Sequence, residues 1–486
     1  MNLRPWQDHC INQALSNYSN GYNHFLTLAT PGAGKTLMAS ALASYLLKNK
    51  LIDLIICFSP SSIVAQDFAE SLETQAGERF DGLMGAKGRS LTYQSLQFLD
   101  GQFWQLFESN RIFVIFDEIH HCAGSNLRNA NSWGEQILLN IHDRAKFTLA
   151  LTGTPWRSDT APIVLSKYIQ SDSQIACDYV YGLAEAVRDK VCRVPQIVAV
   201  DNVKISVVDT NATQVFTSFS DLLSNSNVSY QQVIENEAVL KFIITASHKK
   251  LSKIRLVNPD GAGLIVASSV SHANMISSLM KSWFKEDAVV VTYKESNSST
   301  IIQRFRHSQT RWIISVGMIS EGTNIPRLQV CCHLTNIKTE MHFRQILGRI
   351  LRLTESTNQQ AILYMPAEPK LLEYAYRVKE DIPFEADVVK FENMKENEEY
   401  DKKLNDLPIS FDTPVTQALN KGLNLELSSL EMETFANSSS YEHDTKTKDL
   451  VSEIKEHDLS SSYKNLINNF GRFKQETIAL GLLEFN

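Results

Sequence analysis

Cysteine is scarce in this chain of 486 residues, and its pattern argues against two common ways of stabilising a small fold. Seven scattered cysteines are too few for a disulfide framework, and none belongs to a CxxC pair that would indicate a structural zinc site. We interpret them as free thiols: Cys10, Cys57, Cys122, Cys177, Cys192, Cys331 and Cys332.

Long uncharged runs are also missing from the sequence. No such run approaches the ~20 residues that a membrane span needs. Residues 1–6 lack the charged-then-apolar pattern of a signal segment. We therefore expect a soluble, cytoplasmic protein that has no membrane partner.

A strong charge of one sign is absent from most of the chain. The net charge of −7 divides into −2 for residues 1–160, +4 for residues 161–381 and −9 for residues 382–486. A nearly neutral body neither requires nor excludes a nucleic-acid partner. The acidity is concentrated in the last fifth of the chain.

What the chain does have is an alternation of apolar runs with helix-like stretches, the pattern of a parallel sheet covered by helices. One series predicts strands at 24–29, 53–58, 111–116 and 147–151, with a helix at 35–48. A second series predicts strands at 264–267, 288–292, 312–316, 330–334 and 360–364. Two α/β domains in tandem fit this pattern better than one large sheet.

We place the first domain at residues 1–195 and the second at 196–383, with a helical insertion near 200–260. An acidic connector is expected at 384–447 and a helical C-terminal region at 448–486. The helix is expected because five apolar residues there follow helical spacing. They are Tyr463, Leu466, Ile467, Phe470 and Phe473.

The segment 29–36 (Ala-Thr-Pro-Gly-Ala-Gly-Lys-Thr) follows an apolar strand and opens a helix. Its glycines let backbone N–H groups surround phosphate oxygens, which a helix N-terminus also attracts. The spacing predicts that Lys35 reaches the β- and γ-phosphates of a nucleotide and that Thr36 ligates Mg²⁺. The alternative is a chance glycine-rich turn.

Two carboxylates, Asp117 and Glu118, follow the strand predicted at 111–116. Ligand sites in α/β folds lie at the C-terminal ends of the strands. We predict that Asp117 belongs to the Mg²⁺ shell and that Glu118 polarises the attacking water. For an acidic pair in isolation, a solvated strand end is the alternative.

The segment 345–352 carries Gln345, Arg349 and Arg352 at spacings of four and three, so they share one face of a helix. An amide and two guanidinium groups suit the charge that develops on a phosphoryl group. For this segment alone, a basic helix face in water is the alternative.

Together with further segments, these elements resemble the superfamily 2 helicases and translocases of the DEAD/DEAH-like group, from residue 3 to about residue 365. The segments similar to motifs I to VI occur in the family's order at 29–36, 117–120, 152–157, 264–269, 319–326 and 345–352. The opening Leu-Arg-Pro-Trp-Gln at 3–7 is similar to the segment in which a glutamine, here Gln7, reads adenine.

The resemblance implies two RecA-like lobes with ATP and Mg²⁺ between them, which explains why the phosphate loop and the arginine segment lie about 310 residues apart. It implies ATP binding by Gln7, Gly32, Ala33, Gly34, Lys35 and Thr36, and catalysis by Glu118, Gln345, Arg349 and Arg352. It implies strand contacts by Ser61, Thr92, Gln94, Ser268 and Thr323, and coupling through Thr152, Thr154, Gly322 and Asn324. Because the family usually has aspartate where this chain has Asn324, we expect altered coupling between ATP and the strand.

We predict a Mg²⁺-dependent ATPase that acts as a helicase or translocase on nucleic acid. DNA is favoured over RNA, because the Arg-Pro-aromatic-Gln opening resembles bacterial DNA-repair and restriction-type motors. Hydroxyl and amide contacts hold phosphates without reading bases, so sequence-independent tracking is expected. Arg304, Arg306 and Arg311 form a further candidate strand contact. The alternative function is a nucleotide-gated scaffold that recruits a protein partner through the acidic C-terminal region.

Overall fold

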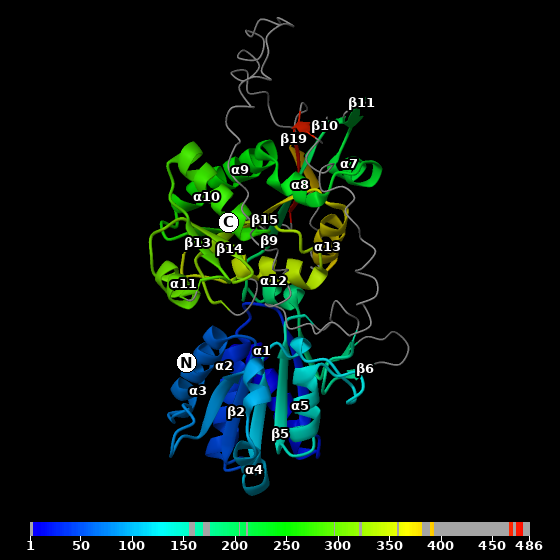
Figure 1. Cartoon of the computed structure of the whole chain (residues 1–486). Coiled ribbons are helices and arrows are strands. Elements are labelled where there is room, and N and C mark those ends of the chain that lie inside the picture. The colour runs from blue at the N-terminus through cyan, green and yellow to red at the C-terminus, as the bar shows by residue number, and fades with distance from the viewer. Residues whose placement is uncertain are drawn as a thin grey trace, which may run out of the picture.

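The computed structural model describes two α/β lobes, which lie one above the other in Figure 1. The described residues are 3–154, 161–168, 175–203, 205–209, 212–295, 297–319, 323–356, 359–381, 389–392, 466–469 and 473–479. Within these ranges, no helix combines the length and the hydrophobicity that crossing a bilayer requires.

The first lobe is built on a sheet of six parallel strands. Their order is β3 (Gly88–Thr92), β2 (Leu54–Ser59), β4 (Ile112–Phe116), β5 (Phe147–Thr152), β1 (His24–Ala29) and β8 (Tyr179–Tyr181). The helices of this lobe are α1 (Pro5–Ser19), α2 (Lys35–Lys48), α3 (Ser62–Ala76), η1 (Tyr93–Phe98), α4 (Gly101–Ser109), η2 (Ile119–His121), α5 (Ser132–Asn140) and α6 (Leu183–Arg188). A small antiparallel pair, β6 (Lys167–Tyr168) and β7 (Ile175–Ala176), stands apart from the sheet.

The second lobe has six parallel strands in the order β13 (Val289–Thr292), β14 (Trp312–Val316), β12 (Ala262–Ala267), β15 (Leu328–Leu334), β16 (Ala361–Pro366) and β9 (Pro195–Asn202). The strand β19 (Phe473–Ala479) extends this sheet by antiparallel pairing with β9, and β17 (Val389–Glu392) pairs antiparallel with β19. Its helices are α7 (Phe219–Asn225), α8 (Tyr230–Glu235), α9 (Glu237–Arg255), α10 (Val270–Phe284), α11 (Ser298–Arg306), α12 (Glu340–Ile350) and α13 (Pro369–Glu380). In Figure 1, α12 lies on the side of this lobe that faces the first lobe.

The two predicted series of strands are confirmed, each to within two residues at either end. Strands such as β4 are apolar and buried along their whole length, because helices cover both faces of a parallel sheet. A continuous apolar core runs from the first lobe into the second, and a separate core around Phe58, Phe116 and Ile137 fills the other face of the first sheet.

The region between residues 200 and 260 differs in part from the helical insertion that we expected. The helices α7, α8 and α9 are present, but they follow an antiparallel hairpin of β10 (Ile205–Asp209) and β11 (Ala212–Phe216). The two strands, Ile-Ser-Val-Val-Asp and Ala-Thr-Gln-Val-Phe, do not alternate strictly between polar and apolar residues, so the period of two that marks a strand is absent from the sequence.

The helix expected across Tyr463–Phe473 is wrong where the structure describes this segment. Leu466–Asn469 is strand β18, which pairs with β10, and the chain from Phe473 onward is β19, which pairs with β9. The edges of β9 and β10 supply backbone partners that the spacing of apolar side chains does not reveal. The acidic connector and the remainder of the C-terminal region lie outside the described residues, apart from β17.

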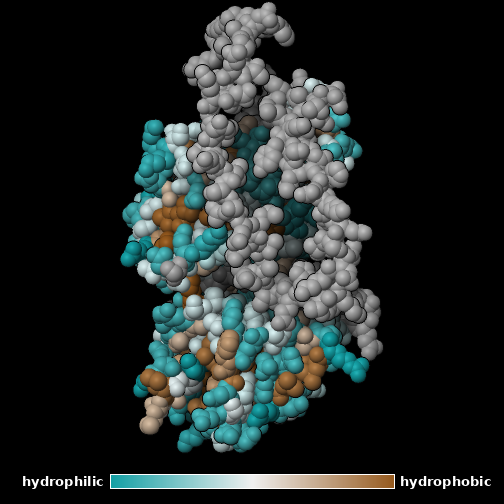
Figure 2. Space-filling view, in the orientation of Figure 1, coloured by the Kyte–Doolittle hydropathy of each residue, from teal (hydrophilic) through white to brown (hydrophobic). Residues whose placement is uncertain are grey.

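On the face of the molecule seen in Figure 2, hydrophilic surface predominates and hydrophobic surface occurs as separate small patches on both lobes. Met84 and Leu256, which are 97% and 84% exposed, are the most exposed large apolar residues among those described. Isolated exposed apolar side chains are normal on protein surfaces. The hydropathy of this face therefore does not single out a functional region.

Candidate nucleotide site between the lobes

The phosphate loop connects β1 to α2 and depends on two glycines in left-handed conformation. Gly32 and Gly34 have φ of 86° and 97°, which side-chain-bearing residues rarely adopt. Two residues of the opening segment brace the loop from α1. The Arg4 guanidinium donates to the carbonyl oxygen of Ala33 at 2.7 Å, and the Gln7 amide donates to that of Gly34 at 2.9 Å.

The neighbouring Trp6 anchors this brace to the sheet. Its ring is 3% exposed and stacks on Tyr181 of β8, with ring centroids 4.7 Å apart. Gln7 is fully buried, and its side-chain oxygen accepts from the Arg4 backbone N–H at 2.8 Å. The opening segment therefore holds the shape of the loop in two ways: Arg4 and Gln7 donate hydrogen bonds to loop carbonyl oxygens, and Trp6 packs the segment against β8.

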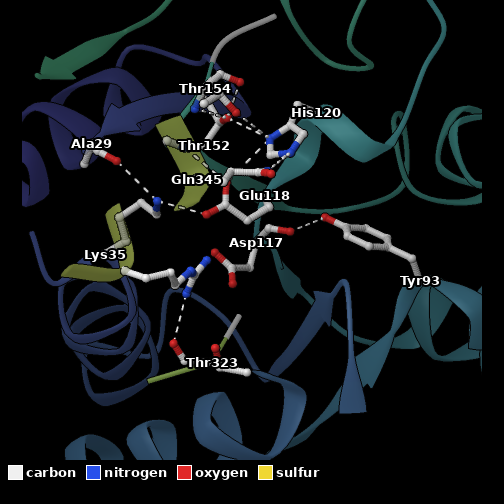
Figure 3. Close-up of polar contacts among 12 residues, drawn as sticks. Ala29, Lys35, Tyr93, Asp117, Glu118, His120, Thr152, Thr154, Thr323 and Gln345 are labelled. Carbon is white, nitrogen blue, oxygen red and sulfur yellow. Dashed lines mark hydrogen bonds and ion pairs between the residues drawn. The ribbon is translucent and has the colours of Figure 1, made fainter. Parts of the chain in front are cut away.

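Glu118 is the centre of the site and contacts three segments of the first lobe (Figure 3). One carboxylate oxygen lies 3.0 Å from Lys35 Nζ, and the other accepts from the Gly153 backbone N–H at 3.1 Å and lies 3.5 Å from His120 Nδ1. Lys35 Nζ also donates to the carbonyl oxygen of Ala29 at 3.2 Å. The segments similar to motifs I, II and III therefore meet at one carboxylate.

The two adjacent carboxylates have opposite electrostatic environments. Burial raises the pKa of Asp117, and the nearby charge of Glu118 adds to this effect. For Glu118, burial also acts to raise the pKa, but the Lys35 ammonium, His120 and the Gly153 N–H together outweigh it, so the pKa is lowered. Glu118 is thus held as a charged acceptor, whereas Asp117 is a buried carboxylate whose charged form a nearby cation would favour.

The helix α12 brings the second lobe into contact with this centre. The Gln345 amide lies 3.5 Å from His120 Nε2, and His120 Nδ1 lies 3.0 Å from the Thr152 hydroxyl (Figure 3). The Thr152 hydroxyl in turn donates to the carbonyl oxygen of Thr154 at 2.8 Å. Residues predicted for catalysis and coupling are therefore joined through His120, for which the sequence suggested no role.

Arg349 of α12 and Arg352, which lies two residues beyond the end of this helix, reach the segment similar to motif V. The predicted helix face therefore carries Gln345 and Arg349, whereas Arg352 lies outside the helix. Arg349 is buried and donates to the carbonyl oxygen of Thr323 at 2.9 Å, and Arg352 donates to the side-chain oxygen of Asn324. Desolvation lowers the pKa of Arg352 to about 9, and the charge of Arg349 adds to this effect. Gly322 lies outside the described residues.

A cavity of about 720 Å³ lies between the lobes, next to the phosphate loop. Thr30, Pro31 and Gly153 line it from the first lobe, and Arg344 and Leu347 of α12 line it from the second. This volume falls within the usual range for small-molecule sites.

The five residues predicted to contact a strand fall into two groups. Ser61, Thr92 and Gln94 lie together at the C-terminal ends of the neighbouring strands β2 and β3, and the Gln94 amide lies 3.4 Å from the carbonyl oxygen of Pro60. Ser268 is on the second lobe, where its hydroxyl contacts His272 Nδ1 at 2.9 Å. Thr323 is 2% exposed, and its hydroxyl is buried without a hydrogen-bond partner.

Two of the three further arginine candidates, Arg306 and Arg311, form ion pairs within the protein. Arg306 lies 3.7 Å from Asp67 of α3, so this pair joins the two lobes, and Arg311 lies 2.7 Å from Glu286 within the second lobe. Desolvation raises the pKa of Asp67, and Arg306 opposes that effect. These contacts were not predictable from the local sequence.

Arg193 is another residue that the sequence did not single out. It is 1% exposed and donates to the carbonyl oxygens of Leu328 at 2.6 Å and Ile350 at 3.1 Å. Burial lowers its pKa to about 10. Because Ile350 is the last residue of α12, this guanidinium holds the C-terminal end of the helix that carries Arg349.

Two family profiles match the chain in the order of the lobes. "Type III restriction enzyme, res subunit" matches residues 1–157, and "Helicase conserved C-terminal domain" matches residues 246–354. The chain belongs to helicase superfamily 2. Its two helicase domains imply ATP use, in agreement with the phosphate loop and the interlobe site.

Relatives of this superfamily 2 chain include an uncharacterized protein of Mycobacterium tuberculosis, 28% identical over 394 residues, which cover 77% of this chain and 62% of that protein. The chain thus spans less than two thirds of the mycobacterial relatives that it matches. A DNA 3'-5' translocase of Sulfurisphaera tokodaii is 23% identical, with 66% of this chain and 73% of that protein covered.

Among solved structures, a fragment assigned to an HsdR subunit of a type I restriction enzyme from Vibrio vulnificus has the same fold. The TM-score is 0.53 at 16% identity, and the match covers 76% of this chain and 65% of that one. At this identity the likeness concerns the fold alone.

Proposed function

We propose that this chain is a motor that hydrolyses ATP between its lobes and uses the energy to move along DNA. The observation that carries the proposal is the continuous contact from Lys35 through Glu118 and His120 to Gln345. This contact runs from the phosphate loop of one lobe to the arginine-bearing helix of the other. A site completed by both lobes links nucleotide state to their relative position.

The proposed chemistry assigns one task to each group. Lys35 and the loop N–H groups bind the β- and γ-phosphates, and Glu118 orients the attacking water and accepts its proton. Gln345 and Arg349 of α12, with Arg352 just beyond its end, approach from the second lobe and stabilise charge on the transferred phosphoryl group.

The Thr36 hydroxyl and the Asp117 carboxylate are hard oxygen ligands of the kind that Mg²⁺ prefers. A cation beside Asp117 would also offset the burial that raises the pKa of this carboxylate. Bound there, Mg²⁺ would neutralise charge on the β- and γ-phosphates.

For the track, Ser61, Thr92 and Gln94 offer hydroxyl and amide groups on one edge of the first lobe, with Ser268 on the second lobe. Thr323 is buried, so we assign it no strand contact. Groups of this kind hold phosphates rather than bases, so we propose sequence-independent tracking. The DNA translocase of Sulfurisphaera tokodaii and the restriction-subunit profile support DNA as the polymer.

The test is steady-state ATP hydrolysis by the wild type with no polymer, single-stranded DNA, duplex DNA or RNA, at low and moderate salt. We expect DNA to stimulate hydrolysis more than RNA, with the stimulation weakened by salt. Stimulation by RNA and not by DNA would show that the motor moves along RNA instead of DNA. Slow hydrolysis that no polymer alters would contradict the motor and favour a nucleotide-gated scaffold.

A further inference from the structure

The backbone of Asp117 is held from two sides by the segments that carry the proposed strand contacts. Its N–H donates to the carbonyl oxygen of Phe58 at 2.9 Å, in β2, which leads into the segment containing Ser61. Its carbonyl oxygen accepts from the Tyr93 hydroxyl at 2.8 Å, as Figure 3 shows. Tyr93 lies between Thr92 and Gln94.

The carbonyl that Tyr93 contacts belongs to the peptide plane between Asp117 and Glu118. The orientation of this plane sets ψ of Asp117 and φ of Glu118, so a displacement of the plane together with its flanking backbone would shift the carboxylates that this backbone carries. Glu118 has φ 50° and ψ 54°, a left-handed conformation that a residue with a side chain keeps only where its surroundings impose it. The Tyr93 hydroxyl is therefore one of the contacts that hold a strained turn at the centre of the site.

Tyr93 is well placed to respond to its own segment. Its side chain is fully buried, and its ring stacks on Trp133, with centroids 5.6 Å apart, and on Phe58 at 6.4 Å. A ring packed on two sides moves with its backbone rather than independently. The adjoining Gln94 is exposed and contacts Pro60, so the two proposed strand-binding segments are joined at this point.

We propose that Tyr93 is a positioning residue that couples strand binding to ATP hydrolysis. A strand bound along Thr92 and Gln94 displaces η1, the Tyr93 hydroxyl follows, and the peptide plane before Glu118 takes its hydrolytic orientation. Tyr93 touches neither nucleotide nor strand. This inference rests on the proposed function, because it requires a strand that stimulates hydrolysis.

The test compares the wild type with Tyr93→Phe, which removes only the hydroxyl, and with Tyr18→Phe as a matched control. Tyr18 is also buried and donates its hydroxyl to a strand carbonyl, that of Thr148 at 2.9 Å, but it has no contact with the carboxylates. The measured quantity is the ratio of hydrolysis with single-stranded DNA to hydrolysis without it. We expect Tyr93→Phe to lower this ratio about fivefold, the usual effect of one buried neutral hydrogen bond on an equilibrium, and Tyr18→Phe to keep the wild-type ratio.

A second readout does not depend on turnover. Linkage requires that nucleotide and strand affect each other's affinity equally. The shift in the dissociation constant for single-stranded DNA caused by a non-hydrolysable ATP analogue should therefore be smaller in Tyr93→Phe than in the wild type. If this variant does not fold, Gln94→Ala, at an exposed position of the same segment, should lower both quantities.

If Tyr93→Phe keeps the wild-type ratio of stimulated to basal hydrolysis, the coupling role of Tyr93 is wrong, while the proposed motor function still stands. Equal losses of basal and stimulated hydrolysis would also overturn the coupling role, because Tyr93 would then only maintain the site. If no polymer stimulates the wild type, the proposed function itself fails, and the coupling role fails with it.

Discussion

Gly348 of α12 lies directly against Pro31 of the phosphate loop, with no room for a side chain between them. A Cβ atom on Gly348 would be 2.5 Å from the Pro31 Cβ and 2.9 Å from its Cγ, distances that such atoms do not adopt. The absence of a side chain at one position of the second lobe therefore allows the arginine-bearing helix to reach the nucleotide loop of the first.

Gly348→Ala should lower the rate of ATP hydrolysis more than about tenfold. Alanine favours a helix by about 1 kcal/mol relative to glycine, so any loss comes from the clash with Pro31 rather than from α12 itself. The measurement is hydrolysis at saturating ATP. Gly101→Ala in α4 is the control, because nothing lies within 4 Å of a Cβ at that position. Wild-type turnover in Gly348→Ala would show that hydrolysis does not need this approach.

Glu118→Gln should bind ATP and hydrolyse it slowly, by a factor on the order of 10²–10⁴, because it loses the general base. Lys35→Ala should instead weaken binding, by about tenfold or more, since it removes a charge-assisted contact to phosphate. Nucleotide titration and single-turnover hydrolysis separate the two effects. Glu108→Gln, a charge change at an exposed position of α4, is the control. Tight binding in Lys35→Ala would remove that residue from the phosphate site.

The Asp67–Arg306 pair should couple the lobes by about 1 kcal/mol, as expected for a partly exposed ion pair at 3.7 Å. A double-mutant cycle with Asp67→Asn and Arg306→Gln, read out as ATP affinity, measures this energy. It should decrease at high salt. The same cycle on Glu286 and Arg311, a pair within the second lobe, should give no coupling in ATP affinity. Equal values for both pairs would show that neither reports on lobe closure.

Stability should fall as the pH drops below about 6.5, because buried histidines are held neutral. Burial lowers the pKa of His333 to about 3 and that of His24 and His272 to about 4. The unfolded chain therefore binds more protons in this window, and the free energy of unfolding decreases by up to about 1.4 kcal/mol per pH unit for each histidine. The stability that the neutral histidines contribute is fully present above the pKa of an unfolded-chain histidine. It is lost progressively as the pH falls toward the lowered pKa of the folded state.

The measurement is the urea midpoint of the wild type and of His333→Leu at pH 7.5 and pH 5. The variant should lose less stability between the two values, because one of the three groups no longer takes up a proton on unfolding. His9→Gln, at an exposed position of α1, should keep the wild-type dependence. An unchanged dependence in His333→Leu would show that His333 is not the group responsible.

The local features of the site were predictable because each depends on a short stretch of chain. A phosphate loop needs glycines between a strand and a helix, and the segment 29–36 has them in sequence. The position of Asp117 and Glu118 after a buried strand follows from five consecutive apolar residues in β4. The family resemblance adds that the two halves face each other across ATP.

The errors came where the neighbours of a segment decide its structure. Apolar residues from Tyr463 to Phe473 have helical spacing, yet the described part of this segment is strand, because β9 and β10 offer open edges to pair with. The backbone groups that form such a pairing have no signature in the spacing of side chains.

The sequence by itself determined the central strands of both sheets, the phosphate loop and the spacing of the arginines, since these are set by local sterics and periodicity. Only the tertiary structure decided which distant residues meet. The Tyr93 hydroxyl donates to the Asp117 carbonyl oxygen, and Gly348 packs directly against Pro31. Arg306 forms an ion pair with Asp67. The last two contacts exist because the two sheets pack in one relative position. That position results from burial summed over both lobes, and no single segment specifies it.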